Sequence, residues 1–377
     1  MINFNCAPIT GDELHFISDA LNGARLSGDG YYGRKCEDWF KKNLSINRAL
    51  LTPSCTHALE MAAILIDVKP GDEIIMPSYT FVSTANAFVL RGARIVFVDI
   101  DPITMNICVG QIEEAISSKT KAIVPVHYAG VACEMANIME IARKHNLYVI
   151  EDAAQGISSK FDGKSLGSIG HLGAMSFHET KNISSGGEGG LLIINDASLI
   201  ERAEILREKG TDRSAFFRGE IDKYSWKDLG SNYLLSEVQA AFLWAQLVNL
   251  DSIIEDRLRK WHLYYKKLSC LQKFEGVELP SRELNNHGNG HIFFIKCQNL
   301  NERNKLREYL STQEIMCVSH YVPLHSSDAG LKFGTFFNKD NFTTRESERL
   351  LRLPMWYGLS NEQVEYVSDK IILFYNS

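Results

Sequence analysis

The 377-residue sequence has no long hydrophobic run, no cluster of basic residues and no closely paired cysteines. No apolar segment approaches the roughly 20 residues that span a bilayer, and residues 1–5 lack the basic and apolar parts of a secretory signal. The formal net charge of -6 argues against a general nucleic-acid or acidic-membrane surface, because such surfaces need clustered positive charge. We therefore expect a cytoplasmic protein that binds neither nucleic acid nor membrane.

The eight cysteines form no Cys-x-x-Cys motif, and the sequence contains no His-Glu-x-x-His. Both absences argue against a zinc site, so we expect no bound metal. Scattered cysteines in a chain of this size are typical of small buried apolar residues in a reducing compartment.

Short β-rich runs alternate with helix-length segments through the first half of the chain. The runs cover residues 73–76, 94–98, 122–126 and 147–150. Apolar strands separated by helices predict a parallel sheet covered on both faces, which is an α/β fold. Residues 57–65 are apolar nearly all round and predict a buried helix.

The second half of the sequence predicts a second, smaller domain. Apolar residues recur at helical spacing from Leu235, and helical composition continues to about residue 268. A Gly- and Asn-rich stretch then precedes an expected strand, helix and strand at residues 291–296, 301–311 and 315–319. We expect a large domain over residues 1–250 and a small α+β domain over residues 251–377, joined by one long helix at about 235–268.

Lys181 and Asp152 together predict a chemistry. A lysine amine forms an imine with an aldehyde, and an aspartate can keep a heteroaromatic nitrogen protonated; pyridoxal phosphate enzymes need both groups. Asp152 follows the run 147–150, at the carboxyl end of an expected strand, where open parallel sheets bind ligands. The alternatives are a solvated lysine and an aspartate that caps the next helix.

Other segments offer partners for a phosphate and for a planar ring. Ser54, Cys55 and Thr56 precede the helix expected at 57–65, whose amino-terminal dipole favours an anion, and Ser176 offers another hydroxyl. Helix capping by Ser54 or Thr56 is the alternative. Tyr79 and Phe81 follow the strand at 73–76, where an aromatic ring can stack on a cofactor or pack in the core. Residues 186–190 match no phosphate-binding fingerprint and predict a tight hairpin before a strand at 191–194.

Taken together, these segments resemble the sugar aminotransferase family (DegT/DnrJ/EryC1/StrS type) of pyridoxal phosphate enzymes. The resemblance runs nearly end to end and is carried by residues 26–30, 53–56, 77–81, 151–155, 176–181, 230–233 and 320–325. It implies the aspartate aminotransferase fold (fold type I), which has a large domain with a mostly parallel central sheet and a smaller α+β carboxyl-terminal domain.

The resemblance also implies roles for individual residues. Lys181 would bind pyridoxal 5′-phosphate covalently, Asp152 would pair with its ring nitrogen, and Gln155 would hydrogen-bond its phenolic oxygen. Phe81 would stack on the ring. The phosphate would be held by Ser54, Cys55, Thr56 and Ser176, and by Asn232 from the other subunit of a homodimer.

The closer likeness, in residues 125–135 and 216–219, is to members that aminate dTDP-4-keto-6-deoxy-D-glucose with L-glutamate, in enterobacterial common antigen and O-antigen synthesis. Pyridoxamine 5′-phosphate would carry the amine between the half-reactions. Expected substrate contacts are Tyr79, His178, Arg213, Arg218, Tyr321 and His325, although both arginines can equally be solvated. A 3-ketosugar, a GDP- or UDP-linked sugar and a non-catalytic ligand-binding regulator remain alternatives, whereas Lys181 argues against a dehydratase.

Overall fold

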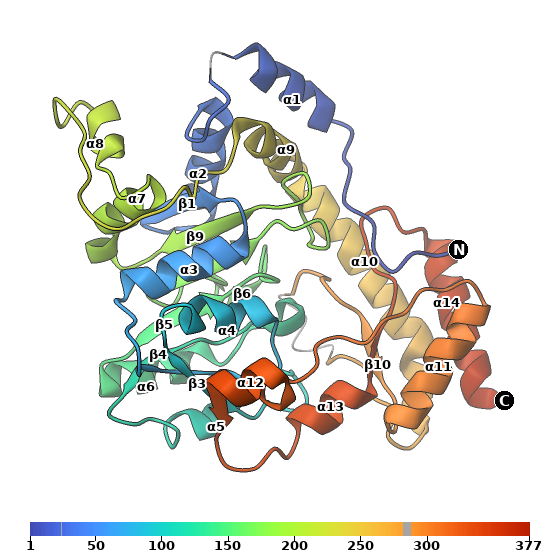
Figure 1. Ribbon diagram of the computed structural model, residues 1–377. Coiled ribbons are helices and arrows are strands. Elements are labelled where there is room, and N and C mark those ends of the chain that lie inside the picture. Colours follow the sequence, from blue (N-terminus) through green and yellow to red (C-terminus); the bar gives the residue numbers. More distant parts are fainter. Residues whose placement is uncertain (24, 282–287) are drawn as a thin grey trace.

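The protein's structure, a computed structural model, describes residues 1–23, 25–281 and 288–377. Within these residues, eight strands form one central sheet (Figure 1). In spatial order they are β1 (Arg48–Thr52), β9 (Gly190–Ile194), β8 (Leu172–Ser176), β5 (Tyr148–Asp152), β4 (Thr120–Ile123), β2 (Glu73–Pro77), β3 (Arg94–Val98) and β11 (Gly334–Phe336). Strand β9 is antiparallel to β1 and β8, and the other neighbours are parallel. The predicted α/β fold with a mostly parallel sheet is confirmed.

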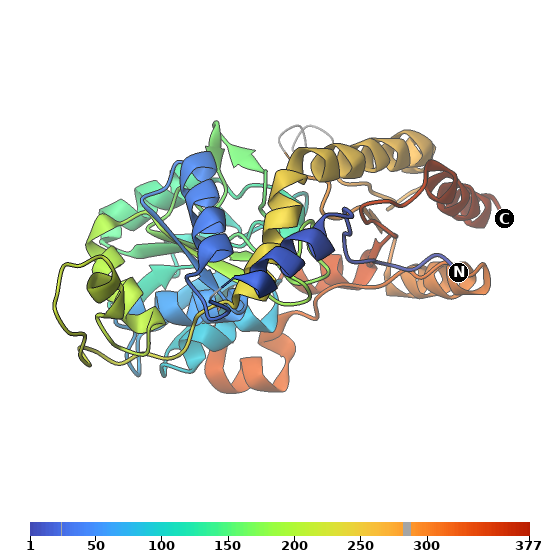
Figure 2. The ribbon, with the colours of Figure 1, turned by 90° about the horizontal axis from the view of Figure 1, so that it is seen from above.

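Alternate strand residues face opposite sides of this sheet, as the two-residue period of a strand requires. In β2, Ile74 and Met76 pack in the core below α3 (Cys55–Leu65) and α4 (Val82–Val89). Ile75 enters a different core, which includes α6 (Met135–His145). Helices thus cover both faces of the sheet (Figure 2), and this burial explains why the strands read as continuous apolar runs.

Further helices surround this sheet. Those that precede residue 250 are α1 (Glu13–Asn22), α2 (Tyr31–Leu44), α5 (Val109–Ile112), α7 (Ile200–Arg207), α8 (Arg213–Phe217) and α9 (Glu237–Val248). The short strands β6 (Lys160–Phe161) and β7 (Lys164–Ser165) form a hairpin. Helices α2 and α9 pack with β1, β8 and β9 in a shared core that contains Phe40, Leu51, Met175, Leu191 and Leu243.

The carboxyl-terminal residues build a separate core around Trp261, Phe293 and Leu306. Its elements are α10 (Leu250–Leu268), β10 (Phe294–Lys296), α11 (Leu300–Thr312), β12 (Leu350–Arg352) and α14 (Asn361–Asn376), with α12 (Asp328–Phe333) and α13 (Thr343–Arg349) nearby in the chain. Strand β11, from the same part of the sequence, pairs with β3 and so extends the central sheet. The division at residue 250 stays a prediction.

The prediction of one continuous helix at 235–268 is wrong. Ser236 caps α9, and the helix ends at Val248. Asn249 leaves helical geometry, with φ -107° and ψ 10°, before α10 begins. Its side-chain amide donates to the carbonyl of Ala245 and to Asp12 Oδ2. A side chain that competes for a helix carbonyl is a known cause of such interruptions.

Two further expectations of local structure are wrong. Residues 315–319 form no strand because they change partner: Ile315 bridges to Ile2, whereas Val318 bridges to Arg352. The glycines at 186–190 form no tight hairpin, since residues 177–189 separate the antiparallel strands β8 and β9. Boundaries differ by two or three residues at α3, β4, β5 and β10. Asn285, Asn286 and His287 lie outside the described residues.

Two whole-chain expectations are also addressed by the structure. In the described ranges, no helix combines the length and apolar character needed to cross a membrane. Five cysteines are buried as expected, at positions 36, 55, 133, 297 and 317; Cys6 and Cys108 are partly exposed, and Cys270 is exposed.

Candidate active site

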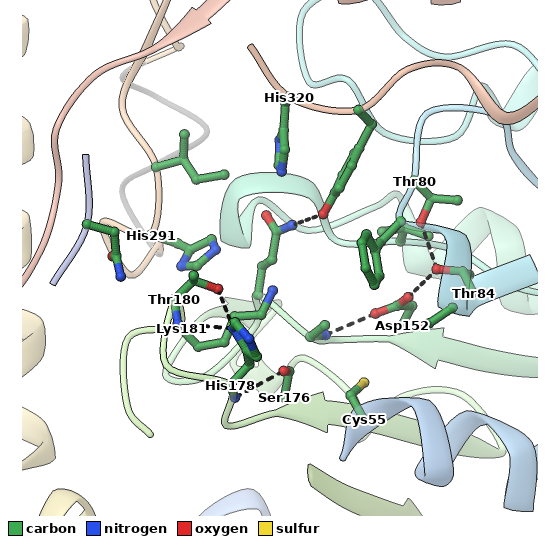
Figure 3. Close-up of a pocket in the computed structure, with 18 of the residues that line it drawn as sticks. Cys55, Thr80, Thr84, Asp152, Ser176, His178, Thr180, Lys181, His291 and His320 are labelled. Atoms are coloured by element: carbon green, nitrogen blue, oxygen red, sulfur yellow. Dashed lines mark hydrogen bonds between the residues drawn. The ribbon is translucent and has the colours of Figure 1, made fainter. Parts of the chain in front are cut away.

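A cavity of about 520 Å³ opens at the carboxyl ends of β2, β5 and β8. Ten residues singled out from the sequence line it: Ser54, Cys55, Thr56, Phe81, Asp152, Gln155, Ser176, His178, Lys181 and Tyr321. Figure 3 shows Lys181, Asp152, Cys55 and His320 around one space, although they come from distant parts of the chain. The sheet therefore gathers most of the predicted site at its carboxyl edge, as parallel sheets do.

Asp152 ends β5 with both carboxylate oxygens held by donors. Thr84 Oγ1 donates to Oδ2 at 2.7 Å, and the backbone N–H of Ala154 donates to Oδ1 at 3.1 Å (Figure 3). The preceding residue, Glu151, points to the other face, where its carboxylate accepts from three backbone N–H groups and meets His127 Nε2. The strand period thus gives the two adjacent acids different environments, and only Asp152 reaches the cavity.

Lys181 lies in the loop between β8 and β9, and its backbone N–H donates to the carbonyl of His178 at 2.9 Å. Its amine has no hydrogen-bond partner among the described residues. Burial lowers the pKa of Lys181, while Cys55 and Asp152 oppose that shift and the charge of Arg352 adds to it. A lowered pKa increases the neutral fraction of the amine, which is the nucleophilic form.

The amino terminus of α3 forms another wall of the cavity. Ser54 Oγ caps α3 by accepting from the backbone N–H of His57, which is the helix-capping role considered as an alternative for this serine. Ser54 also lines the cavity. Thr56 Oγ1 donates to Ser83 Oγ at 2.8 Å. Ser176 Oγ accepts from the backbone N–H of His178 at 3.3 Å. Hydroxyls and helix N–H groups thus collect at one end of the cavity.

Gly190 allows β9 to pass unusually close to this wall. A Cβ atom at that position would lie 2.3 Å from the carbonyl carbon of Ser54 and 2.4 Å from the backbone nitrogen of Cys55. Any other residue would therefore displace the first turn of α3 or the strand.

Gln155 connects the cavity to the carboxyl-terminal residues. Its Oε1 accepts from the backbone N–H of Ala129 at 2.7 Å, and its Nε2 donates to Tyr321 OH at 3.0 Å. The ring of Phe81 lies 6.2 Å from that of Tyr321, tilted by 44°. About half of Phe81 is exposed, so one aromatic surface remains open toward the cavity.

The other predicted site residues do not line the cavity of the single chain. Tyr79 is buried against Tyr128. Arg213 pairs with Glu208, and Arg218 pairs with Glu204 and Glu220. His325 contacts Ser78 through Nδ1 and Asp340 through Nε2, and Asn232 is exposed. The roles expected for these residues, including that of Asn232 in a partner's site, stay predictions.

Several cavity residues were not anticipated from the sequence: Phe4, Asn5, Thr84, His291, His320 and Arg352. Thr84 belongs to the hydroxyl-rich run 78–84, and His320 directly precedes Tyr321, so local sequence carried a signal for both. The sequence around Phe4 and Arg352 gave no such signal, because these residues reach the cavity only when chain segments far apart in sequence pack together.

The donor groups present fit pyridoxal 5′-phosphate. An unpaired, partly desolvated amine on Lys181 suits a bond to an aldehyde, and the oriented carboxylate of Asp152 suits a protonated ring nitrogen. The hydroxyls and helix terminus at Ser54 to Thr56 suit a phosphate.

Comparisons with known proteins agree with this chemistry. The model of the DegT/DnrJ/EryC1/StrS aminotransferase family matches residues 8–372. A pleiotropic regulatory protein of Geobacillus stearothermophilus is 37% identical over 84% of this chain and 82% of its own length. GDP-perosamine synthase of Escherichia coli O157:H7 is 31% identical over 98% of this chain and 97% of its own.

A third relative is named for a different nucleotide and ring position. UDP-N-acetyl-3-dehydro-alpha-D-glucosamine 3-aminotransferase of Acidithiobacillus ferrooxidans is 34% identical over 97% of this chain and 94% of its own length. Among solved structures, S. venezuelae DesV in complex with a ketimine intermediate matches with a TM-score of 0.87 and 28% identity, covering 99% of both chains.

Proposed function

Since the chain belongs to the DegT/DnrJ/EryC1/StrS aminotransferase family, we propose that it is a dTDP-4-amino-4,6-dideoxygalactose transaminase. The coarser identity is established: the protein is a sugar aminotransferase of fold type I, and its cofactor is pyridoxal 5′-phosphate. The proposed reaction moves the amine of L-glutamate to C4 of dTDP-4-keto-6-deoxy-D-glucose, giving dTDP-4-amino-4,6-dideoxy-D-galactose and 2-oxoglutarate. The observation that carries the aminotransferase chemistry is that the amine of Lys181 and the carboxylate of Asp152 line one cavity.

The bound cofactor would supply an aldehyde carbon that receives the amine and a ring that delocalises an electron pair. Asp152, oriented by Thr84, would hold the proton on the ring nitrogen. Lys181, whose pKa is lowered by burial, would take up and return the substrate proton at its amine. Gln155 and Phe81 would position the ring, and the phosphate would be held by Ser54, Cys55, Thr56 and Ser176.

We propose a homodimer that completes each site. Asn232 is exposed on the single chain, and the resemblance assigns it to the phosphate of the opposite subunit. The exposed aromatic residues Phe217, Tyr224 and Trp226 lie in the same stretch of chain, which supports an interface there. The free cysteines support a reducing, cytoplasmic compartment.

The choice of dTDP and of C4 is supported by the likeness in residues 125–135 and 216–219 to enzymes of enterobacterial common antigen and O-antigen lipopolysaccharide synthesis. In this proposal Arg213 and Arg218 would approach the diphosphate, and Tyr79, His178, Tyr321 and His325 the sugar. A second candidate is amination of a GDP- or UDP-linked ketosugar, including a 3-ketosugar, because relatives of similar identity are named for such substrates. The cofactor site would be the same for each.

A non-catalytic regulator is the candidate of another class, and one relative carries a regulatory name. Lys181 and Asp152 are both present and both line the cavity, which favours catalysis. Borohydride reduction of the purified protein, followed by peptide mass spectrometry, should find the cofactor attached to Lys181. Absence of any bound cofactor would favour the regulator.

The substrate is tested with dTDP-, GDP- and UDP-linked 3- and 4-ketosugars, each supplied with L-glutamate, and mass spectrometry of the products. We expect amination of dTDP-4-keto-6-deoxy-D-glucose alone or by far the fastest. Amination of only a GDP- or UDP-linked sugar would exclude the named substrate. Lys181→Ala should abolish turnover and still bind pyridoxamine 5′-phosphate, and turnover by this variant would reject the assigned role.

A further inference from the structure

Arg352, the last residue of β12, lies in the wall of the cavity and has no counter-ion among the described residues. Its only hydrogen bond by the side chain within the described ranges runs from Nη2 to the carbonyl of Ser319, at 3.0 Å. Its Nε is buried and has no partner, and no carboxylate of the described residues pairs with it. A guanidinium carries five N–H donors, so most of the hydrogen-bonding capacity of Arg352 is unused.

The groups around Arg352 are aromatic or neutral. Its guanidinium lies 4.7 Å from the centre of the Phe4 ring. The hydroxyls of Tyr79, Tyr128 and Tyr321 are the nearby groups that favour its charge. Burial lowers the pKa of His320 and of His291 well below the usual range, so both imidazoles are neutral near pH 7. None of these groups neutralises the cation.

Within the described part of the chain, two carboxylates line the cavity, and both are engaged elsewhere. Asp152 accepts from Thr84 and from the backbone of Ala154. Glu188 lies 3.6 Å from His178 Nε2. A desolvated charge is costly unless it is paired. We therefore expect a ligand to supply the counter-ion of Arg352. A guanidinium best matches a carboxylate or a phosphate group.

Resting on the proposed aminotransferase function, we propose that Arg352 binds the carboxylate of the amino-acid donor. In an α-amino acid the carboxylate is bonded to the carbon that carries the reacting amine, so it must lie close to Lys181. In a nucleotide-linked 4-ketosugar, the diphosphate is attached across the ring from the reacting carbon. Arg352 and Lys181 line the same cavity, and the charge of Arg352 is one of the causes that lower the pKa of Lys181, which fits the nearer anion.

The contact with Phe4 gives the proposed carboxylate site a defined geometry. Phe4 belongs to the first residues of the chain, and its carbonyl accepts from the backbone N–H of Met355, three residues beyond Arg352. The carbonyl of Ser319 holds Nη2 at the same time. A planar guanidinium fixed at two places loses little further conformational entropy when it binds a carboxylate through two N–H groups.

The experiment compares Arg352→Met with the wild-type holoenzyme by calorimetric titration with glutarate, a dicarboxylate that has no amine to react. A charge-assisted hydrogen bond of the usual strength predicts roughly 10- to 150-fold weaker glutarate binding in the variant. Binding of dTDP should not change. The exposed Arg345, which does not line the cavity, supplies the matched control Arg345→Met, for which we expect wild-type binding of both ligands.

Single-turnover kinetics give a second readout, in which L-glutamate removes the visible absorbance of the pyridoxal holoenzyme. Arg352→Met should need roughly 10- to 150-fold more L-glutamate for half-maximal rate. Arg352→Lys keeps the charge without the planar fork and should recover part of the affinity. This intermediate value, with an unchanged melting temperature, would exclude a general loss of structure.

Two outcomes would overturn the proposal: wild-type affinity of Arg352→Met for glutarate, or weaker binding of dTDP with glutarate binding intact. The second would assign the cation to the diphosphate. Failure of the proposed function has a different signature, because the wild-type holoenzyme itself would then not be converted by L-glutamate or any other amino acid.

Discussion

The hydroxyl of Thr84 donates a hydrogen bond to Asp152 Oδ2, with 2.7 Å between the two oxygens. The direction follows from chemistry, because an ionised carboxylate can only accept. Since Thr84 has a single hydroxyl proton, the 2.8 Å contact between Thr80 Oγ1 and Thr84 Oγ1 must run from Thr80 to Thr84. Thr84, on the first turn of α4, and Thr80, which lies just before that helix, therefore together orient the carboxylate at the end of β5.

Replacing Thr84 by valine should weaken cofactor binding. Valine keeps the shape of the side chain but removes a charge-assisted hydrogen bond, which predicts a dissociation constant for pyridoxal 5′-phosphate roughly tenfold higher or more. Quenching of protein fluorescence in titrations of the apoprotein measures this constant. Thr312→Val, which removes an exposed hydroxyl bonded to the carbonyl of Tyr309, is the control. Equal cofactor affinity in both variants would show that Thr84 does not position Asp152.

Lys181→Met should stabilise the apoprotein at neutral pH. Burial lowers the pKa of Lys181 from 10.5, so the folded state pays a desolvation cost while the amine is charged. As pH rises through the lowered pKa toward 10.5, the folded state loses the proton first, and the stability of the wild type increases. The advantage of Lys181→Met should therefore shrink with rising pH.

Urea unfolding of the apoproteins between pH 7 and pH 10 measures this effect. Lys119→Met removes an exposed amine and should show no comparable pH dependence. A Lys181→Met apoprotein that is less stable than wild type at pH 7 would contradict the assignment of a desolvation cost to this amine.

Gly190→Ala should disturb the phosphate wall of the cavity. The new methyl group would fall within 2.4 Å of backbone atoms of Ser54 and Cys55, which cannot move as a flexible side chain does. We expect a loss of about 1–3 kcal/mol in the free energy of unfolding. Gly110→Ala, where the added methyl group would meet no described atom within 4 Å outside its own helix backbone and chain neighbours, should be neutral or slightly stabilising in urea unfolding. Equal stabilities would indicate that β9 can shift freely.

Asp99 should be important for stability rather than for catalysis. Its fully buried carboxylate accepts from the backbone N–H groups of Ile100, Asn341, Phe342 and Thr343 and from the Thr343 hydroxyl. In Asp99→Asn, an NH₂ group would face some of these donors in place of an accepting oxygen. We expect the free energy of unfolding to fall by about 1–3 kcal/mol. Asp369→Asn, on the exposed face of α14, is the control in thermal and urea unfolding. Unchanged stability of Asp99→Asn would contradict the prediction.

The sequence predicted best where one physical pattern dominates. The run 94–98 is β3, because its residues from Ile95 to Val98 are apolar and buried on both faces of the sheet, and only Arg94 at its start is exposed. Helix α11 was expected within one residue at each end, and Asn299 caps it. The interruption at Asn249 could not be predicted, since it depends on the contact of that side chain with Asp12 on a distant segment.

The same contrast holds for the site. Asp152 and Ser176 could be placed because the carboxyl ends of parallel strands share an edge. Arg352 could not, because its approach to the cavity depends on how residues 350–352 pair with 294–296. Tyr79 follows the expected strand, but in the single chain its ring is buried beside Tyr128, a position that the order of residues in the sequence does not specify; its expected contact with the sugar stays a prediction.

Strand β11 has a consequence for how the molecule is made. It joins the sheet beside β3 through residues 334–336, some 240 positions later in the chain than its neighbour, as the pairing of Gly334 with Ile95 shows. His320, Tyr321 and Arg352 come from the same late part. During synthesis the earlier strands can assemble, but the sheet edge stays open and the catalytic chamber lacks a wall until nearly all of these residues have left the ribosome. We therefore expect activity only after the chain has been made through Arg352, and none from shorter nascent chains.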